Sequence, residues 1–500
     1  MIDAVSHRKL SQELSKILPS SEQVFDDARS LEEYSKDLSF TPAIRPGCVV
    51  RPKTGEEVRS IVGWANQTGT PLVPVSSGPP HFRGDTVPSV GGAVIVDLSG
   101  LNRIVRIDRR NKIAIVEPGV TFDQLQPELA RAGMVLSMPL LPRRSKSVVT
   151  SLLEREPILI PRFQWQLLDP LRFLEVVWGN GDTLRTGEAG AYRPIDADKP
   201  IMQLAPFGPV QVDYYRLVSA AQGTMGIVMW AAAKCEVLPT VHEFFFVPSD
   251  TLNPLIDLAY KVLRVRFGDE LFIMNNANLA SVAGEDREEI ERLKQELPNW
   301  VLVLGIAGRN RLPEERVRFQ REDISGMCQD LGLKLLSRVC TVNGTQMEQL
   351  LGQCNRETPW KLSGKGGGQD IFFLTTLDRT PEFIEAVSAV SREEKYSTAD
   401  IGIYLQPTQQ GASCHCEFNF PFDPGNSSQR GIVSGLYRRA SETLLKHDAF
   451  FSRPYGIWAD MVYNRDAQTT MTLKKIKGIF DPNNIMNPGR LFWAETAREG

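Results

Sequence analysis

Short apolar runs in the first part of the chain alternate with polar loops and amphipathic segments. Two such runs, residues 71–75 and 93–98, bracket a stretch rich in Ser, Gly and Pro, which is the pattern of a strand, an exposed loop and a second strand. Before them, Thr54 and Glu57 stand at the spacing of a capping box, and Gly69 provides a stop, so a helix is predicted between these points. The order of the elements predicts a β-α-β rhythm.

The alternation continues downstream. Residues 113–121 predict a strand that leads into a helix over residues 122–132. Residues 173–178 and 184–186 flank a Gly-Asn-Gly-Asp turn, which is the pattern of a two-stranded hairpin. These segments predict further strands in the same half of the chain.

A different pattern occupies residues 240–451. Longer amphipathic helices, such as residues 252–266, alternate with strands such as residues 301–306. The β-rich end of this region is predicted at residues 400–405 and 414–420. The change in pattern indicates a second, separately organised region.

The chain has 500 residues and a formal net charge of −3, and this length predicts more than one domain with a sizeable core. Such a charge gives no long-range attraction for nucleic acid or for an anionic membrane. Because no membrane span or secretory signal is found, we expect a cytoplasmic protein. The seven scattered cysteines form no C-x-x-C pair and predict neither a disulfide framework nor an iron–sulfur or zinc site.

The loop between the first two apolar runs has the most informative sequence. It reads VPVSSGPPHFRGD over residues 73–85, and backbone N–H groups and small hydroxyls in such a loop can wrap a pyrophosphate. Together with VEPGVT at residues 116–121, AQGTMGIV at residues 221–228 and the closing IFDPNNIMNPGRLFW at residues 479–493, it resembles the vanillyl-alcohol oxidase and p-cresol methylhydroxylase (PCMH) family. These strings occur in the family's order along nearly the whole chain.

The resemblance implies an α+β protein: a two-domain PCMH-type FAD-binding fold plus an antiparallel-sheet cap domain that holds the substrate. We expect the FAD-binding domain at residues 1–239, the cap at residues 240–455 and a C-terminal segment, residues 456–500, that returns to the FAD-binding domain. FAD is the implied cofactor, and its N5 would accept the hydride. The residues implied to bind FAD are Ser76, Ser77, Gly78, Pro79, Pro80, His81, Ser147, Thr150, Ser151, Glu154, Gly223, Thr224, Gly226, Ile227, Asn487 and Arg490.

The largest departure from the family in this half is the stretch at residues 147–163, SVVTSLLEREPILIPRF. The family has glycines and an asparagine where this chain has Thr150, Ser151, Glu156 and Ile158. Small residues let backbone approach a ligand closely, so their loss predicts a shifted loop or an altered flavin contact.

The implied catalytic residues match the family's alkylphenol branch only in part. Tyr455 falls on one of two phenolate-binding tyrosines, whereas the second falls on Arg83 and the arginine expected after Tyr455 is Gly456. The family's acid has no counterpart near Pro142. Arg83 instead suits a carboxylate or another anionic head group. The other arginines expected near the site, Arg143, Arg144 and Arg453, are interpreted as solvated or phosphate-contacting.

His415 is the third catalytic candidate. It resembles the second of two metal-binding histidines in the related D-2-hydroxyacid dehydrogenases, but the first stands as Thr408 and the later glutamate is also missing, so no metal is predicted. His415 could act as a base or substrate ligand, or be a buried strand histidine. We expect FAD to be dissociable, because the family's two attachment positions fall near Ser413 and Pro79, with His415 and His81 each two residues away.

The leading hypothesis is an FAD-dependent oxidoreductase that takes hydride from a small aromatic alcohol, an alkylphenol-like compound or a carboxylated substrate. Electrons would pass to oxygen or to a partner protein. A metal-free D-2-hydroxyacid dehydrogenase and a non-catalytic homologous subunit of a flavoenzyme complex are the alternatives. The family also implies a homo-oligomer, and neither a nucleic-acid nor a membrane partner is expected.

Overall fold

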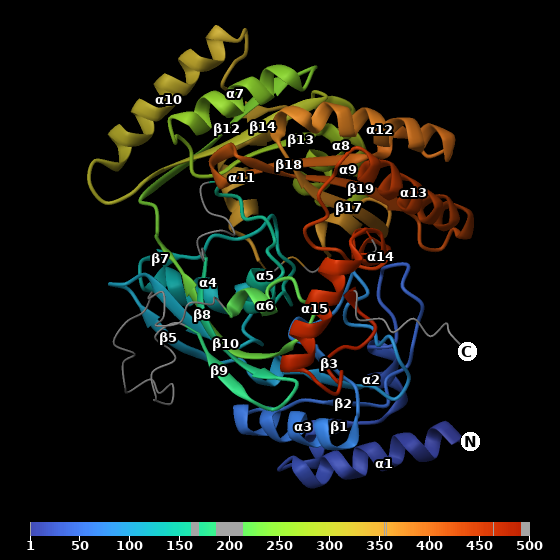
Figure 1. Ribbon diagram of the computed structural model, residues 1–500. Helices are drawn as coiled ribbons and strands as arrows, with labels where there is room; N and C mark the ends of the chain where they lie inside the picture. The colour runs from blue at the N-terminus through green and yellow to red at the C-terminus, as the bar shows by residue number, and fades with distance from the viewer. Residues whose placement is uncertain are drawn as a thin grey trace.

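The structure is a computed structural model that describes residues 2–161, 170–186, 214–354, 356, 358–463 and 465–491. Residues 162–163 and 492–493, at the ends of two strings quoted above, lie outside this range. The chain forms two layered halves, with the red C-terminal helices between them at one side (Figure 1). Within the described residues, no helix is long and apolar enough to cross a membrane.

The first half begins with helix α1 (Ile2–Ile17) and a four-stranded sheet in the order β1-β2-β4-β3. The strands are β1 (Val24–Phe25), β2 (Cys48–Val50), β3 (Leu72–Val75) and β4 (Val94–Asp97), and the helices are α2 (Ala28–Glu33) and α3 (Gly55–Thr68). Strand β4 runs parallel to β2 and β3, as the predicted β-α-β rhythm requires. Thr54 caps α3, but Glu57 accepts from Lys53 N at 2.7 Å, so only half of the predicted capping box forms.

A second, antiparallel sheet of five strands follows, in the order β5-β6-β10-β8-β9. The elements here are β5 (Ile104–Asp108), β6 (Ile113–Val116), α4 (Phe122–Arg131), β7 (Met134–Val135), α5 (Val148–Leu153), β8 (Leu171–Trp178), β9 (Thr183–Arg185), α6 (Tyr215–Val218), β10 (Gly226–Lys234) and β11 (Glu236–Val237). Strands β8 and β9 form the predicted hairpin.

The second half is built on a six-stranded antiparallel sheet in the order β12-β14-β13-β18-β19-β17. Its strands are β12 (Val241–Ser249), β13 (Leu271–Asn275), β14 (Trp300–Gly308), β17 (Gly367–Thr375), β18 (Gly402–Thr408) and β19 (Ser413–Phe422), and β15 (Arg338–Val339) pairs with β16 (Val342–Asn343) beside it. The antiparallel sheet expected for this half is therefore present.

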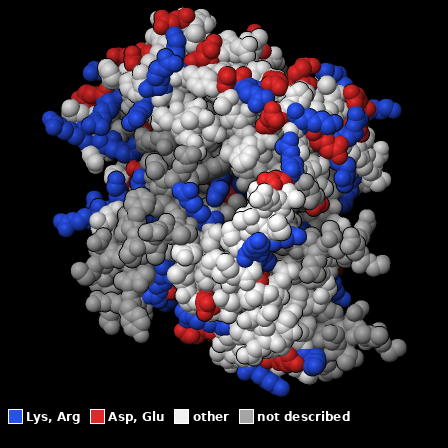
Figure 2. All heavy atoms as spheres, in the orientation of Figure 1, with Lys and Arg blue, Asp and Glu red and all other residues white. Residues whose placement is uncertain are grey.

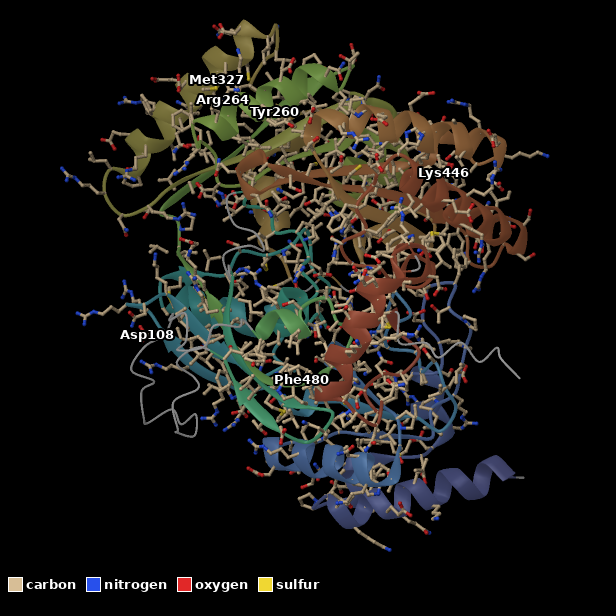
Figure 3. The ribbon with its side chains drawn as sticks, viewed as in Figure 1. Asp108, Tyr260, Arg264, Met327, Lys446 and Phe480 are labelled. Carbon is tan, nitrogen blue, oxygen red and sulfur yellow. The ribbon has the colours of Figure 1, made fainter. Side chains whose placement is uncertain are left out.

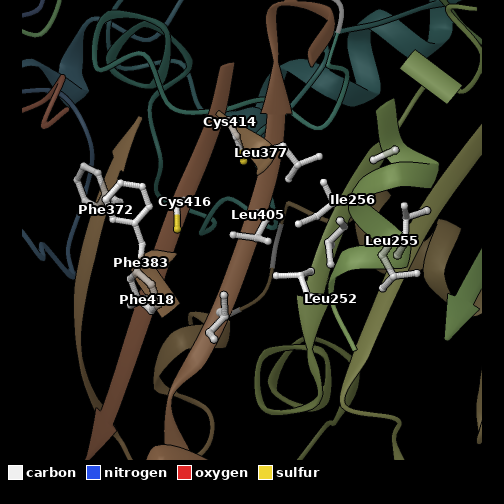
Figure 4. Packing of buried hydrophobic residues seen from close by; sticks show 14 of the residues in the cluster. Leu252, Leu255, Ile256, Phe372, Leu377, Phe383, Leu405, Cys414, Cys416 and Phe418 are labelled. Atoms are coloured by element: carbon white, nitrogen blue, oxygen red, sulfur yellow. The ribbon is translucent and has the colours of Figure 1, made fainter. Parts of the chain in front are cut away.

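Helices cover both faces of this sheet (Figure 1). The outer face packs against α7 (Asn253–Arg264), α10 (Pro313–Asp330), α12 (Thr380–Glu393) and α13 (Ser427–Lys446). The inner face packs against α8 (Asn276–Ala283), α9 (Arg287–Glu296) and α11 (Gly344–Gly352). Cys414, Cys416 and Phe418 point into the outer core (Figure 4), so strand alternation turns His415 and Glu417 toward the first half.

The C-terminal segment links the halves. Helix α14 (Ile457–Tyr463) is followed by α15 (Ala467–Phe480), whose Phe480 ring lies 4.4 Å from the ring of Trp178 (Figure 3). Beyond α15, Leu72 N donates to Ile485 O at 2.7 Å and Asn487 N donates to Leu72 O at 2.8 Å. The closing string thus pairs with the strand that precedes the Ser-Gly-Pro loop.

Candidate functional site

A cleft lies between the two halves and encloses about 1730 Å³ of space between protein atoms, part of it open to solvent. Figure 2 shows the hollow between the halves on one face, with both signs of charge interspersed over the cap. The first half contributes the loop after β3, the segment around α5 and the turn before β10. The cap contributes the short 3-10 helix Trp360–Leu362 together with Asp370, Tyr404 and Glu417.

The two turns expected to enclose a diphosphate meet at this cleft. Gly223 adopts a φ of +71°, and a Cβ on it would stand 2.6 Å from Pro74 Cγ, so only glycine permits this close packing. Asn487 clamps the turns together, because its Nδ2 donates to Gln222 O at 2.8 Å and to Asp85 O at 3.0 Å. The closing string therefore sets the spacing between the turns.

The predicted FAD-binding residues fall into two groups. Those that line the cleft are Ser76, Ser77, His81, Thr150, Glu154, Gly223, Gly226 and Ile227. Those that are not in its wall are Gly78, Pro79, Pro80, Ser147, Ser151, Thr224, Asn487 and Arg490. Ser147 of the second group holds two members of the first in place: its N donates to Ser77 Oγ at 3.0 Å, and its Oγ accepts from Thr150 N at 3.1 Å.

The segment that departs from the family's glycine-rich pattern begins as a helix. Ser147 is the N-cap of α5, and the helix ends at Glu154. The two glutamates that follow the helix join a buried ion cluster: Lys146 Nζ lies 2.6 Å from Glu154 Oε2 and 3.0 Å from Glu156 Oε1. Of the residues that replace the family's small ones, Glu156 thus places a carboxylate in the cleft wall, beside Glu154.

Arg83 completes this cluster. Its guanidinium lies 3.4 Å from Glu154 Oε2 and 3.7 Å from Glu156 Oε1, and its Cζ stands 5.0 Å from the centre of the Tyr455 ring. Burial disfavours the charged form of Glu156, but Lys146 and Arg83 outweigh it and hold the pKa of Glu156 well below its usual range. Arg83, predicted to grip an anion, already has two anionic neighbours.

Asp85 is a cleft residue that the sequence analysis missed. It follows Arg83 by two positions and lines the cleft, yet among the described residues it has no ion-pair partner. Burial, reinforced by the charge of Glu154, raises the pKa of Asp85 to about 6. Its position next to a glycine in a polar loop gave no signal that it would line a cleft.

Arg453 also lines the cleft and is only 2 % exposed, so the prediction of a solvated arginine is wrong for this residue. Its Cζ stands 4.2 Å from the centre of the Phe372 ring, and its Nη2 lies 3.4 Å from His415 Nδ1. Among the described residues, its Nε and Nη1 have no hydrogen-bond partner and no carboxylate pairs with it. Burial lowers the pKa of Arg453 to about 10, and the nearby Arg83 adds to the effect, but the group stays charged at neutral pH.

A chain of buried polar groups runs from the cap to Arg453. Lys361 Nζ lies 2.6 Å from both Asp370 Oδ2 and Glu417 Oε1, and Glu417 Oε2 lies 3.0 Å from His415 Nε2. Despite its burial, the pKa of Glu417 is held well below its usual range by Lys361 and His415. The sequence analysis had not named Lys361, Asp370 or Glu417.

His415 itself does not form part of the cleft wall. It is 1 % exposed, and burial lowers its pKa to about 4 against the opposing effect of Glu417. A neutral ring that donates from Nε2 to Glu417 leaves Nδ1 free to accept from Arg453. His415 is therefore placed to orient Arg453, and a direct catalytic role for it stays a prediction.

The residues of the cleft fit FAD. His81 is buried, and its Nε2 has no hydrogen-bond partner among the residues that the structure describes. Burial together with Arg143 lowers its pKa to about 3, so a neutral nitrogen is available for a cofactor atom. Small side chains at Ser76, Ser77 and Gly226 leave room for a ligand. Among the described residues, no group of three His, Cys, Asp or Glu residues could hold a metal ion.

Comparison with known proteins identifies the family. Residues 46–187 match the FAD binding domain, and residues 253–491 match the C-terminal domain of FAD linked oxidases. The chain belongs to the FAD-linked oxidoreductases of the PCMH and vanillyl-alcohol oxidase family. The predicted FAD cofactor, family and fold class are confirmed, and this FAD-linked oxidoreductase is an enzyme of the oxidase and dehydrogenase type.

Two relatives and one solved structure match nearly the whole flavoprotein. It is 25 % identical over 498 residues to D-2-hydroxyglutarate dehydrogenase of Stutzerimonas stutzeri, covering 96 % of this chain and 98 % of that one. It is 23 % identical over 467 residues to a mitochondrial D-lactate dehydrogenase [cytochrome] of Arabidopsis thaliana, covering 91 % of this chain and 75 % of that one. The crystal structure of p-cresol methylhydroxylase with substrate bound superposes with a TM-score of 0.80 at 19 % identity, covering 97 % of each chain, which shows the shared fold.

Acid denaturation of this flavoprotein is expected to release its FAD. Neither Ser413 nor Pro79 carries an imidazole to which the flavin could be attached, and both nitrogens of His415 are engaged by Glu417 and Arg453. The measurement is the flavin absorbance of pellet and supernatant after trichloroacetic acid precipitation. Flavin that stays with the pellet would contradict the prediction, and His81→Gln would then test the one cleft-lining histidine as its anchor.

Proposed function

We propose that this flavoprotein oxidises a small 2-hydroxy acid whose carboxylate is held by Arg453. Bound FAD supplies the chemistry by accepting hydride from the carbon that bears the hydroxyl group. The observation that carries the proposal is the buried Arg453 guanidinium in the cleft wall, which forms no ion pair with a carboxylate in the part of the chain that the structure describes. The protein's own residues bind the acid, orient it and hold its proton.

Arg453 has two donor atoms, Nε and Nη1, that make no hydrogen bond among the described residues. A buried donor without a partner costs about 1–3 kcal/mol, and more if it is charged. A substrate carboxylate can accept from Nε and Nη1 together, which is the paired geometry that a planar guanidinium favours. The ring of Phe372, over which the guanidinium lies, and His415 beside it hold the Arg453 guanidinium in place before the substrate binds.

Oxidation of a hydroxyl group also requires a group that accepts its proton. Asp85 lines the same cleft without an ion-pair partner among the described residues, and its pKa of about 6 suits proton exchange near neutral pH. The carboxylates of Glu154 and Glu156 already form ion pairs with Lys146 and Arg83. We therefore assign the proton-accepting role to Asp85.

The two relatives that cover most of the chain support this substrate class, because both are named for 2-hydroxy acids. An alkylphenol is the weaker candidate. Tyr455 is available in the cleft, but Arg83 beside it is paired with glutamates, and Gly456 provides no side chain for a phenolate. The electron acceptor would be oxygen or a protein, and the cytochrome in the name of the second relative favours a protein. We also propose that the protein forms a homo-oligomer.

The test is anaerobic reduction of the purified holoprotein. We expect 2-hydroxy acids of one configuration to bleach the flavin absorbance, whereas alkylphenols and benzylic alcohols leave it unchanged. Arg453 binds the carboxylate, so methyl esters of the same acids serve as matched controls and should not bleach the flavin. Bleaching by an alkylphenol but by no 2-hydroxy acid would refute the proposal.

A further inference from the structure

A second cavity lies beside the cleft, with about 1040 Å³ of space between protein atoms by the same measure. The two spaces are adjacent, because both are lined by Phe82, Arg83, Lys361, Asp370 and Tyr455. The second cavity is bounded by the first half, by the cap and by α14. A molecule bound at Arg453 could therefore extend past Arg83 and Tyr455 into it.

Aromatic side chains form a large part of the wall of this second cavity, beside polar and charged ones. Six rings contribute to it: Phe40, Phe82, Phe372, Tyr437, Tyr455 and Trp458. Arg83 stands at the boundary, with its Cζ 4.8 Å from the centre of the Phe372 ring and 5.0 Å from that of Tyr455. Rings in this arrangement attract a further aromatic ring through offset or edge-to-face contacts, and the arginine can stack on its face.

Gly456 lies at the solvent-exposed edge of the cavity. Its φ is +52°, and a Cβ built on it would meet nothing closer than Tyr437 Oη at 3.9 Å. Gly456 and Tyr437 both line the cavity, so a side chain at position 456 would project into it. A bulky side chain at position 456 would therefore take up space beside Tyr455.

We propose that the second cavity binds an aromatic ring carried by the substrate, which makes the substrate an aryl-substituted 2-hydroxy acid. The inference rests on the proposed function for the reacting end, since the carboxylate and the hydroxyl-bearing carbon stay in the cleft with Arg453 and Asp85. Arg83 and Tyr455 then act as the boundary between the reacting end and the ring. A short aliphatic acid would leave the second cavity unused.

The first arm of the test measures binding without turnover. Isothermal titration of the holoprotein with 3-phenylpropionate and with propionate is expected to show about tenfold or greater tighter binding of the aryl acid. In Gly456→Trp this advantage should disappear, while propionate binds as before. Gly456→Ala is the matched control, because it carries the same left-handed backbone cost without the bulk and should keep the advantage.

The second arm measures flavin reduction by 3-phenyllactate and by lactate. We expect Gly456→Trp to lower kcat/KM for 3-phenyllactate about tenfold with little change for lactate. If neither acid reduces the flavin but the aryl acid still binds in a manner that Gly456→Trp abolishes, the proposed reaction fails and the aryl site stands. Equal binding of the two acids to the unaltered protein, or an advantage that survives Gly456→Trp, would overturn the aryl site itself.

Discussion

Replacing Arg453 by methionine is expected to lower kcat/KM for a 2-hydroxy acid by about 30- to 4000-fold, because losing one partner of a buried, hydrogen-bonded charge pair costs about 2–5 kcal/mol. The same change should not destabilise the empty protein. Two of the donor atoms of Arg453 have no hydrogen-bond partner in the described part of the chain, and methionine of similar length can keep the contact with Phe372. The measurements are steady-state kinetics and the midpoint of thermal unfolding.

The substitution Arg453→Lys tests whether binding depends on the paired donor geometry of the guanidinium or only on its positive charge. Lysine keeps a cation over Phe372 but lacks the planar pair of donors, so most of the loss in kcat/KM should remain. His415→Gln should produce a smaller loss that falls mainly on KM, because it disturbs only the contact at Nη2. A large fall in thermal stability with unchanged kcat/KM in Arg453→Met would instead assign Arg453 a structural role.

Much of the FAD-binding half could be predicted because its signals are local in sequence. The loop at residues 73–85 and the glycines at 223 and 226 are constrained by backbone geometry, and a string of a few residues carries that constraint. The same reasoning recognised the hairpin of β8 and β9, since its turn needs specific residues. The capping box was only half right, because Glu57 had a competing donor at Lys53 N and a further one at Gln23.

The substrate side could be predicted less well because its contacts are long-range. The strand period shows that His415 and Glu417 share a face, but not that Lys361, 56 residues upstream, supplies the ammonium that pairs with Glu417. Arg453 was interpreted as solvated or phosphate-contacting because arginine side chains are mostly exposed, but in the fold it is 2 % exposed and packs over Phe372. Ion pairs between distant segments leave no periodic signal.

Asp481→Asn is expected to destabilise the FAD-binding half and to weaken FAD retention. Asp481 is 2 % exposed, lies 2.6 Å from Lys477 Nζ and accepts from Ile485 N at 3.0 Å and Met486 N at 2.9 Å. Loss of the carboxylate removes the counter-charge of a buried ammonium, which costs about 3–5 kcal/mol. Lys477 also donates to Thr224 O at 2.5 Å, so a displacement of Lys477 would disturb the turn that contains Gly223.

The control for this substitution lies on the same helix. Asp466 caps the start of α15 at the surface, so Asp466→Ala should cost about 1 kcal/mol and leave FAD bound. The measurement is the urea concentration at which flavin is released, followed by fluorescence, together with the flavin-to-protein ratio after dialysis. Because Asn487 joins the two turns only while the closing string stays docked on β3, Asp481→Asn should lose FAD at a urea concentration well below that for Asp466→Ala. Equal release by the two variants would mean that the turns hold their spacing without the Lys477–Asp481 pair.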